Sequence, residues 1–314
     1  MHSVPPKNGE SRAKKAENAL VQTIYMKRFG LIGHPIAHSL SPALFKAGYD
    51  SRYPYELIET SDFEDAYERF LQEYDGINVT APFKELAFRK ADILSEECQK
   101  IGATNLLIKT PEGIKAYNSD YLGVRLWLSE VDGEVEKSVL PPWPQGEGPA
   151  PKEWEGFFFQ PPYQVPSTVL IIGLGGAGKA AAEAARSLGF DTILMNRTLH
   201  HEGIRPLDDF CECFRKADII IYNIPAAIPQ LAELTDYDLR GLTENADVQG
   251  RPKFILEANY KNPSFTESLI ERMKAVNPDI GYTSGRTWLL YQALTGYELF
   301  TGEKPDLAQM SAVI

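Results

Sequence analysis

The stretch STVLIIGLGGAGKAAAEAARSLGFDTILMNRT, residues 167–198, decides the fold of the second half of the chain. An apolar run rich in β-branched residues leads into a cluster of glycines, and an alanine-rich segment then runs to Gly189, where a second apolar run begins. This pattern predicts a strand, a turn, a helix and a second strand. Gly173, Gly175 and Gly178 complete a G-x-G-x-x-G motif between the first strand and the helix, which is the setting that a dinucleotide-binding turn requires.

Each glycine of that motif has its own physical role. The first makes the tight turn, the second lets backbone approach a pyrophosphate, and the third lets the helix pack closely on the strand. The N-terminus of the helix then faces the phosphates. These roles predict a Rossmann-type domain over residues 167–283, with a plain tight turn between strand and helix as the alternative.

The end of the second strand indicates which dinucleotide is bound. Domains that bind NAD carry an Asp or Glu there for the ribose 2′-hydroxyl, whereas this chain has Asn196, Arg197 and Thr198. An arginine offers a planar fork of donors to a 2′-phosphate. NADP(H) is therefore favoured over NAD, and an exposed surface arginine is the alternative.

Composition limits the classes of partner. The 314 residues are 43% apolar and 24% charged, with a net charge of −11, which suits about two globular domains and argues against nucleic-acid or anionic-membrane partners. No apolar run approaches the roughly 20 residues of a membrane span. Cys98, Cys211 and Cys213 have no metal-ligand spacing and fit a reducing cytoplasm. We therefore expect a cytoplasmic protein that binds a small molecule through local groups.

The rest of the chain divides into four segments. Residues 26–130 alternate strands and helices, which predicts a second, parallel-rich α/β unit in which KELAFRKADIL forms a helix. Residues 131–166 hold eight of the 22 prolines and are expected to form an insert or linker. Residues 1–25 form a polar extension, and residues 284–314 begin with an amphipathic helix.

The segment GINVTAPFKELAF, residues 76–88, contains a candidate acid/base. Asn78 and Thr80 share one face of the expected strand. Pro82 can begin a helix and places Lys84 in its first turn, where a cation opposes the helix dipole. That setting suits a lysine that exchanges protons, although a solvated lysine is the alternative.

Further polar residues each allow a structural and a functional interpretation. Asp120 in AYNSDYLGV can cap a helix, and Asn105 in IGATNLLIK can be a turn amide. In GHPIAHSLSPALF, residues 33–45, Ser41 precedes a proline and is typical of an N-cap, whereas capping does not account for Ser39. Two hydroxyls on one side of an extended segment, next to a helix N-terminus, predict a carboxylate-binding pair. Together these residues indicate hydride transfer on a polyhydroxylated small molecule.

Several motifs stand in an order typical of one enzyme family. GHPIAHSLSP, NVTAPFKELAF, IGATN, YNSD, GLGGAG followed by NRT, and a late SG..WLLYQA resemble those of shikimate dehydrogenases, over residues 27–125 and 167–305. The resemblance implies reversible reduction of 3-dehydroshikimate to shikimate with NADPH in aromatic amino-acid biosynthesis. It also implies an N-terminal substrate domain, a Rossmann cofactor domain, and a C-terminal helix that packs back on the first domain.

The resemblance further implies a role for each matched residue. Lys84 and Asp120 match the catalytic pair, in which Lys84 gives a proton to the forming alkoxide and Asp120 orients it. The substrate residues are Ser39, Ser41 and Tyr260 for the carboxylate, and Thr80, Asn105 and Gln292 for the ring hydroxyls. The cofactor residues are Gly173, Gly175, Gly176, Ala177, Gly178, Asn196, Arg197, Thr198 and Gly285.

One loop departs from the family pattern and keeps two alternatives open. YNIPAAIPQ stands where the family has N-x-T/S with a nearby glycine, next to the nicotinamide site. A non-catalytic ligand-binding paralogue has this loop as its support, and retention of Lys84 with Asp120 opposes it. A quinate/shikimate dehydrogenase that uses NAD would need an acidic residue near 196–198, which is missing. A monomer or a homodimer is expected.

Overall fold

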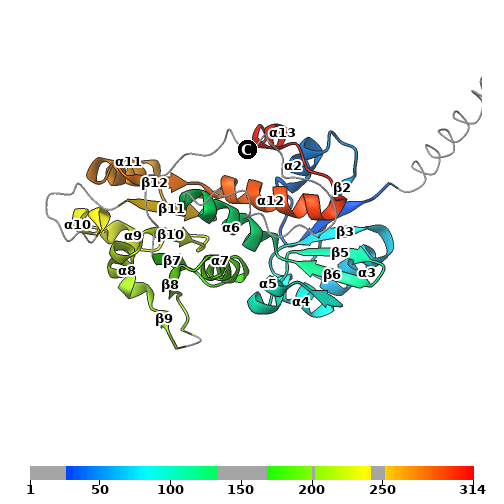
Figure 1. Ribbon diagram of the computed structural model, residues 1–314, viewed down its shortest axis with the longest axis horizontal. Helices are drawn as coiled ribbons and strands as arrows, with labels where there is room; N and C mark the ends of the chain where they lie inside the picture. The colour runs from blue at the N-terminus through cyan, green and yellow to red at the C-terminus, as the bar shows by residue number, and fades with distance from the viewer. Residues whose placement is uncertain (1–25, 133–167, 200–201, 242–251) are drawn as a thin grey trace, which may run out of the picture.

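Two six-stranded sheets, one in each half of the chain, form the framework of the protein (Figure 1). The computed structural model describes residues 26–132, 168–199, 202–241 and 252–314. The predicted 1–25 extension and nearly all of the predicted insert lie outside these described residues. Within the described ranges, no helix combines the length and apolar composition that crossing a membrane requires.

The first sheet has the strand order β2-β1-β3-β5-β6-β4 and is mixed. Its strands are β1 (Phe29–Gly33), β2 (Tyr55–Glu59), β3 (Gly76–Val79), β4 (Ile93–Leu94), β5 (Leu106–Thr110) and β6 (Gly113–Tyr117). The strands β1, β2 and β3 are parallel, as the alternation of strands and helices predicted, but β5 is antiparallel to both neighbours. Two residues join β5 to β6, and a connection that short allows only an antiparallel hairpin.

Helices pack on this sheet, and their ends lie close to those predicted from the sequence. They are α2 (Ser41–Gly48), α3 (Phe63–Glu73), α4 (Lys84–Lys90) and α5 (Glu96–Ile101). The prediction of one helix through KELAFRKADIL was wrong at its end, because Ile93 and Leu94 form β4 beside β6. Asp92 fixes the change from helix α4 to strand β4, because its carboxylate accepts the main-chain N–H of Ile114 in β6 at 2.7 Å.

The second sheet has the order β12-β11-β10-β7-β8-β9, and all its neighbouring strands are parallel. Its strands are β7 (Thr168–Ile172), β8 (Asp191–Met195), β9 (Ile204–Arg205), β10 (Ile219–Tyr222), β11 (Lys253–Glu257) and β12 (Ile280–Thr283). Its helices are α7 (Gly176–Ser187), α8 (Phe210–Lys216), α9 (Gln230–Glu233), α10 (Asp236–Arg240) and α11 (Glu267–Val276). The predicted Rossmann-type architecture is confirmed, and the described residues contain no cluster of His, Cys, Asp and Glu that could hold a metal.

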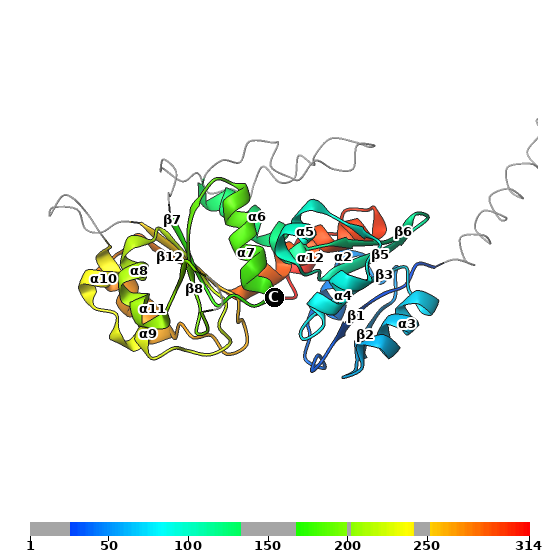
Figure 2. The ribbon, with the colours of Figure 1, turned by 90° about the horizontal axis from the view of Figure 1, so that it is seen from below.

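Two long helices connect the sheets. The helix α6 (Ser119–Asp132) leads out of the first sheet, and α12 (Gly285–Thr301) returns from the second and packs beside α6 (Figures 1 and 2). A Cβ on Gly123 of α6 would lie 2.7 Å from the main-chain nitrogen of Gln292, so this glycine permits the close crossing. Leu290, Leu294 and Phe300 of α12 share an apolar cluster with residues of the first sheet, which confirms the predicted return of the C-terminal helix.

Candidate active site

The glycine-rich turn has the geometry of a dinucleotide-binding loop. Gly173 has φ +85°, which favours glycine, and a Cβ on Gly178 would lie 1.8 Å from the carbonyl oxygen of Gly173. No described atom lies within 4 Å of where a Cβ on Gly175 would stand. Gly175 is the N-cap of α7 and offers no side chain to its first N–H groups. These donors are therefore open to an anion.

Asn196 ties the end of β8 to this loop. Its Oδ1 accepts the main-chain N–H of Leu174 at 3.3 Å, and its Nδ2 donates to the carbonyl of Thr198 at 3.0 Å. Arg197 and Thr198 are exposed on the turn that Asn196 holds. No Asp or Glu stands at this strand end, so the charge available there is positive.

The side chains of Lys84 and Asp120 form an ion pair between two different helices of the first half of the chain. Lys84 is the first residue of α4, Asp120 is the second residue of α6, and the lysine Nζ lies 2.5 Å from the Asp120 Oδ2. The side chains are only 17% and 14% exposed. The alternative that Asp120 caps its helix is wrong, because the Oδ1 of Asn118 accepts the N–H of Tyr121 at 3.1 Å. The Asp120 carboxylate is thus left for the lysine.

The Lys84 side chain also reaches the glycine-rich turn. A Cβ on Gly176, the first residue of α7, would lie 3.2 Å from the Cδ of Lys84. Figure 2 places α7 on the side of the second sheet that faces the first half of the chain. The candidate acid/base therefore lies against the turn that would hold a dinucleotide.

Ser39 and Ser41 are brought together, but with their expected structural roles exchanged. The predicted N-cap role of Ser41 was wrong, because α2 begins at Ser41 and its N-cap, Leu40, has no side-chain capping bond. The hydroxyl of Ser39 instead accepts the Ser41 N–H at 3.2 Å, so the expectation that capping does not explain Ser39 was also wrong. The two Oγ atoms lie 3.1 Å apart, on one side of the segment as predicted.

Thr80 brings the loop with these serines close to the segment that carries Lys84. A Cβ on Gly33, the last residue of β1, would lie 2.3 Å from the methyl group of Thr80. The Thr80 N–H donates to the carbonyl of Ile32 at 2.9 Å. Because β1 and β3 are parallel neighbours, their carboxyl ends and the loops that follow share one edge of the sheet.

Asn105 and Gln292 are joined through Ser119. The Ser119 N–H donates to the Oδ1 of Asn105 at 2.7 Å, and the Ser119 hydroxyl lies 3.0 Å from both the Asn105 Nδ2 and the Gln292 Oε1. Asn105 and Ser119 are buried. Ser119 is not among the residues predicted for the site, although it stands inside the YNSD motif and next to Asp120.

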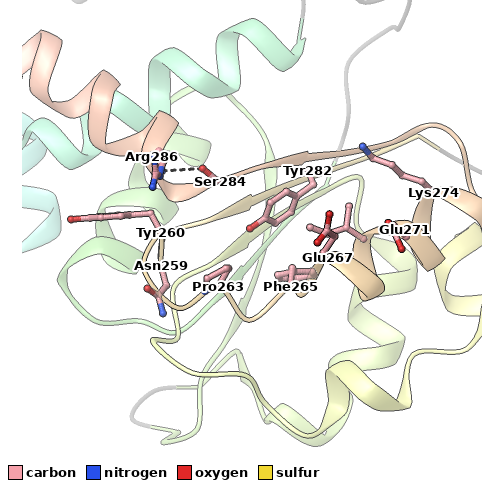
Figure 3. Close-up of a pocket in the computed structure, with 11 residues that line it drawn as sticks. Asn259, Tyr260, Pro263, Phe265, Glu267, Glu271, Lys274, Tyr282, Ser284 and Arg286 are labelled. Atoms are coloured by element: carbon pink, nitrogen blue, oxygen red, sulfur yellow. Dashed lines mark hydrogen bonds between the residues drawn. The ribbon is translucent and has the colours of Figure 1, made fainter. Parts of the chain in front are cut away.

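Tyr260 and Gly285 lie at the carboxyl ends of β11 and β12. A pocket of about 460 Å³ lies there. Figure 3 shows Tyr260 directed away from Tyr282 and close to Arg286. Burial raises the pKa of Tyr260, and Arg286 opposes the rise. Among the described contacts, the Tyr260 hydroxyl has no hydrogen bond to Ser39 or Ser41.

Gly285 is required by the packing of α12. A Cβ there would lie 2.2 Å from the carbonyl oxygen of Ala258, just beyond β11. Ser284 caps the helix by accepting the Arg286 N–H at 3.3 Å (Figure 3). Gly285 is therefore needed for the close approach of α12 to the end of β11, and this role does not depend on a cofactor.

Comparisons with known proteins agree with this arrangement. Residues 31–107 match the shikimate dehydrogenase substrate binding domain. A shikimate dehydrogenase (NADP(+)) from Carboxydothermus hydrogenoformans is 26% identical over 92% of this chain and 96% of its own length. The chain is thus similar to shikimate dehydrogenases over nearly its whole length. Residues 152–237 match the NAD binding domain of D-isomer specific 2-hydroxyacid dehydrogenases.

A solved structure and a longer polypeptide give further matches to this chain. The crystal structure of shikimate 5-dehydrogenase from Thermus thermophilus in complex with shikimate superposes with a TM-score of 0.64 at 25% identity, covering 92% of this chain and 97% of that one. Pentafunctional AROM polypeptide 1 from Lodderomyces elongisporus is 28% identical over 94% of this chain but only 18% of its own length. A segment similar to this chain therefore also occurs as part of a larger polypeptide.

Proposed function

We propose that this protein is a shikimate dehydrogenase that reversibly reduces 3-dehydroshikimate to shikimate with NADPH. The observation that carries the proposal is the partly buried pair of Lys84 and Asp120, placed directly against Gly176 of the dinucleotide-binding turn. An acid/base group beside a hydride-carrying cofactor is what reduction of a carbonyl to an alcohol requires.

The residues around the turn fit NADP(H). The open face of Gly175 and the N-terminus of α7 would take the pyrophosphate, and Gly176 and Ala177 provide the first helical N–H groups. Asn196, Arg197 and Thr198 would take the adenosine 2′-phosphate, since a guanidinium suits a phosphate and no carboxylate stands there to repel it. When bound, the cofactor supplies the hydride.

Lys84 and Asp120 would handle the proton. In the direction of reduction, the Lys84 ammonium donates a proton to the oxygen that becomes an alkoxide, and in oxidation the neutral amine takes it back. The Asp120 carboxylate holds the Lys84 Nζ in place. Their low exposure excludes most of the water that would otherwise compete for these bonds.

The remaining polar residues would bind the substrate. Ser39 and Ser41 present adjacent hydroxyls for the carboxylate, and Tyr260 of the other half of the chain would add a third. Thr80, Asn105 and Gln292 would bond the ring hydroxyls. The bonds of Ser119 leave Asn105 and Gln292 each with an N–H that no described partner takes, so both amides can donate to hydroxyl oxygens.

The divergent loop after β10 is held in place by its own contacts. The Tyr222 hydroxyl donates to the carbonyl of Ala226 at 2.7 Å and accepts the N–H of Ile228 at 3.1 Å. The Asn259 Nδ2 donates to the carbonyl of Pro225 at 3.1 Å. These bonds fix the backbone of the loop, and the Lys84–Asp120 pair is what opposes the alternative of a non-catalytic paralogue.

The organisation of the chain follows from the proposed function. Residues 26–130 with 284–314 would form the substrate domain, and residues 167–283 the cofactor domain, with 131–166 as a linker. The three free thiols, Cys98, Cys211 and Cys213, suit the reducing cytoplasm that we propose for the protein. A monomer or homodimer is proposed, which size-exclusion chromatography with light scattering would decide.

The function can be tested by giving the purified protein NADP or NAD together with shikimate or quinate. Cofactor reduction is then followed by absorbance. Turnover is expected with NADP and shikimate. Faster turnover with NAD and quinate would instead favour the quinate enzyme. Binding of shikimate without turnover of any pair would overturn the enzymatic proposal.

A further inference from the structure

The helix α7 faces the first half of the chain with two opposite charges one turn apart. The Nζ of Lys179 lies 3.2 Å from the Oε1 of Glu85 in α4, and the Oε1 of Glu183 lies 3.5 Å from the Nζ of Lys100 in α5. At both points an acidic side chain faces a basic one, so the charges on α7 complement those on α4 and α5. Each ion pair links the two halves of the chain.

The two ends of this contact differ in their packing. Ile101 and Ala103, at the α5 end, belong to the same apolar cluster as Ala181 and Ala184 of α7, and all four are buried. Close apolar packing of that kind resists separation. Near the start of α7, by contrast, Lys179 and Glu85 have side chains that are 45% and 58% exposed. The contact at this end therefore depends more on the exposed ion pair than the contact at the α5 end does.

The exposed pair lies at the reaction site. Glu85 directly follows Lys84 in α4, and Lys179 is in the first turn of α7 with Gly176, against which the Lys84 side chain lies. Bringing Glu85 and Lys179 together therefore also brings the acid/base lysine to the dinucleotide-binding turn. Separating Glu85 from Lys179 would move Lys84 away from that turn.

We propose that Glu85 and Lys179 form a latch that holds the two halves of the chain closed and positions Lys84 against the cofactor turn. The inference rests on the proposed function for its effect on turnover, whereas the closure itself does not depend on which substrate is used. Both are positioning residues, since they act through the placement of Lys84. An exposed ion pair is weak, so the latch can open in each catalytic cycle.

Charge exchange tests the latch. Glu85→Lys and Lys179→Glu should each lower kcat/KM about 3- to 5-fold at low ionic strength, while the double exchange should return it to within about 2-fold of the wild type. The deficit of each single variant should shrink at high salt, because exposed charges are screened. The matched control is exchange of Glu64 and Lys90, a pair 2.6 Å apart with exposures of 63% and 39% that lies wholly in the first half. It should leave kcat/KM unchanged.

A second measurement reports closure without activity. Spin labels at Glu68→Cys in α3 and Ala275→Cys in α11, both exposed, would give the distance between the two halves. Each single charge variant should shift this distribution to longer distances, and the double exchange should restore it. An unchanged distribution would overturn the latch even if shikimate is turned over. Failure of the double exchange to restore kcat/KM would also overturn it, since Lys179 would then act directly on cofactor phosphates.

Discussion

The indole N–H of Trp288 donates to the main-chain carbonyl of Asp120 at 3.2 Å. Trp288 is buried in the helix that returns from the second sheet, whereas Asp120 is in the first turn of the helix that leaves the first sheet. The backbone that carries the carboxylate partner of Lys84 is therefore fixed by a residue 168 positions away along the chain. The geometry of the acid/base pair depends on the crossing of α6 and α12.

Replacing Lys84 by methionine should abolish proton transfer and keep most of the packing on Gly176. We expect Lys84→Met to lower kcat by about 10²- to 10⁴-fold, the usual contribution of a general acid/base, with little change in the KM for shikimate. Steady-state kinetics would measure the split. A rise in KM at unchanged kcat would make Lys84 a binding residue and refute the acid/base role.

Both serines should matter for substrate binding when each is replaced by alanine. Ser41→Ala removes one hydroxyl, and because hydrogen bonds to charged groups are worth about 1.5–3 kcal/mol, the KM for shikimate should rise about 10- to 100-fold. It should also destabilise the fold, because the Ser41 hydroxyl is a hydrogen-bond partner of the buried Tyr55 and Tyr297 side chains. Ser39→Ala should raise KM too, and should also destabilise the fold by about 1 kcal/mol, since its hydroxyl caps the start of α2. Kinetics and thermal melts measure both effects. A Ser39→Ala variant that melts at the wild-type temperature would count against the capping role of Ser39.

Arg197→Ala should change which cofactor is preferred. Loss of a charged hydrogen bond to the 2′-phosphate should lower kcat/KM for NADP about 10- to 100-fold and leave that for NAD nearly unchanged. The measurement is the ratio of the two values in wild type and variant. An unaltered ratio would show that Arg197 is an ordinary surface residue.

Glu130 should make stability depend on pH. Burial raises the pKa of Glu130 to about 7, against the lowering effect of Tyr291, whose hydroxyl donates to both carboxylate oxygens at 2.9 and 2.8 Å. The folded protein then holds a proton that the unfolded chain releases at lower pH, so stability falls as pH rises from about 4.5 to 7. Glu130→Gln should match the wild type near pH 4.5 and exceed it above pH 7 by at most about 3 kcal/mol. Denaturant unfolding at both pH values tests this, and a variant less stable than wild type at pH 8 would contradict it.

Gly178→Ala should disrupt the dinucleotide-binding turn. A Cβ at 1.8 Å from the Gly173 carbonyl forces the start of α7 away from β7. We expect a clear loss of thermal stability and of NADP binding, measured by melting and by fluorescence titration. Gly189→Ala is a useful contrast: no described atom lies within 4 Å of its Cβ position, so only its φ of +85° should cost stability, and NADP binding should persist.

Much of the first half of the site could be predicted because its signals are local. The positions of Lys84 at the start of α4 and of Ser39 and Ser41 on one side of a segment follow from short-range spacing. The capping roles could not be predicted, since Ser39 and Ser41 are two residues apart and either can accept an N–H bond. Likewise, nothing in AYNSDYLGV indicates that Asn118 caps α6 and leaves Asp120 available to Lys84.

The sequence by itself determined the glycine-rich turn, the missing carboxylate after β8 and the order of the motifs. Those features depend on backbone sterics and on the chemistry of neighbouring residues, which a chain carries wherever it folds. Only the tertiary structure decided that Lys84 lies against Gly176, that Ser119 joins Asn105 to Gln292, and that Glu85 meets Lys179. These contacts join residues far apart along the chain, so they depend on how the two sheets and their connecting helices pack.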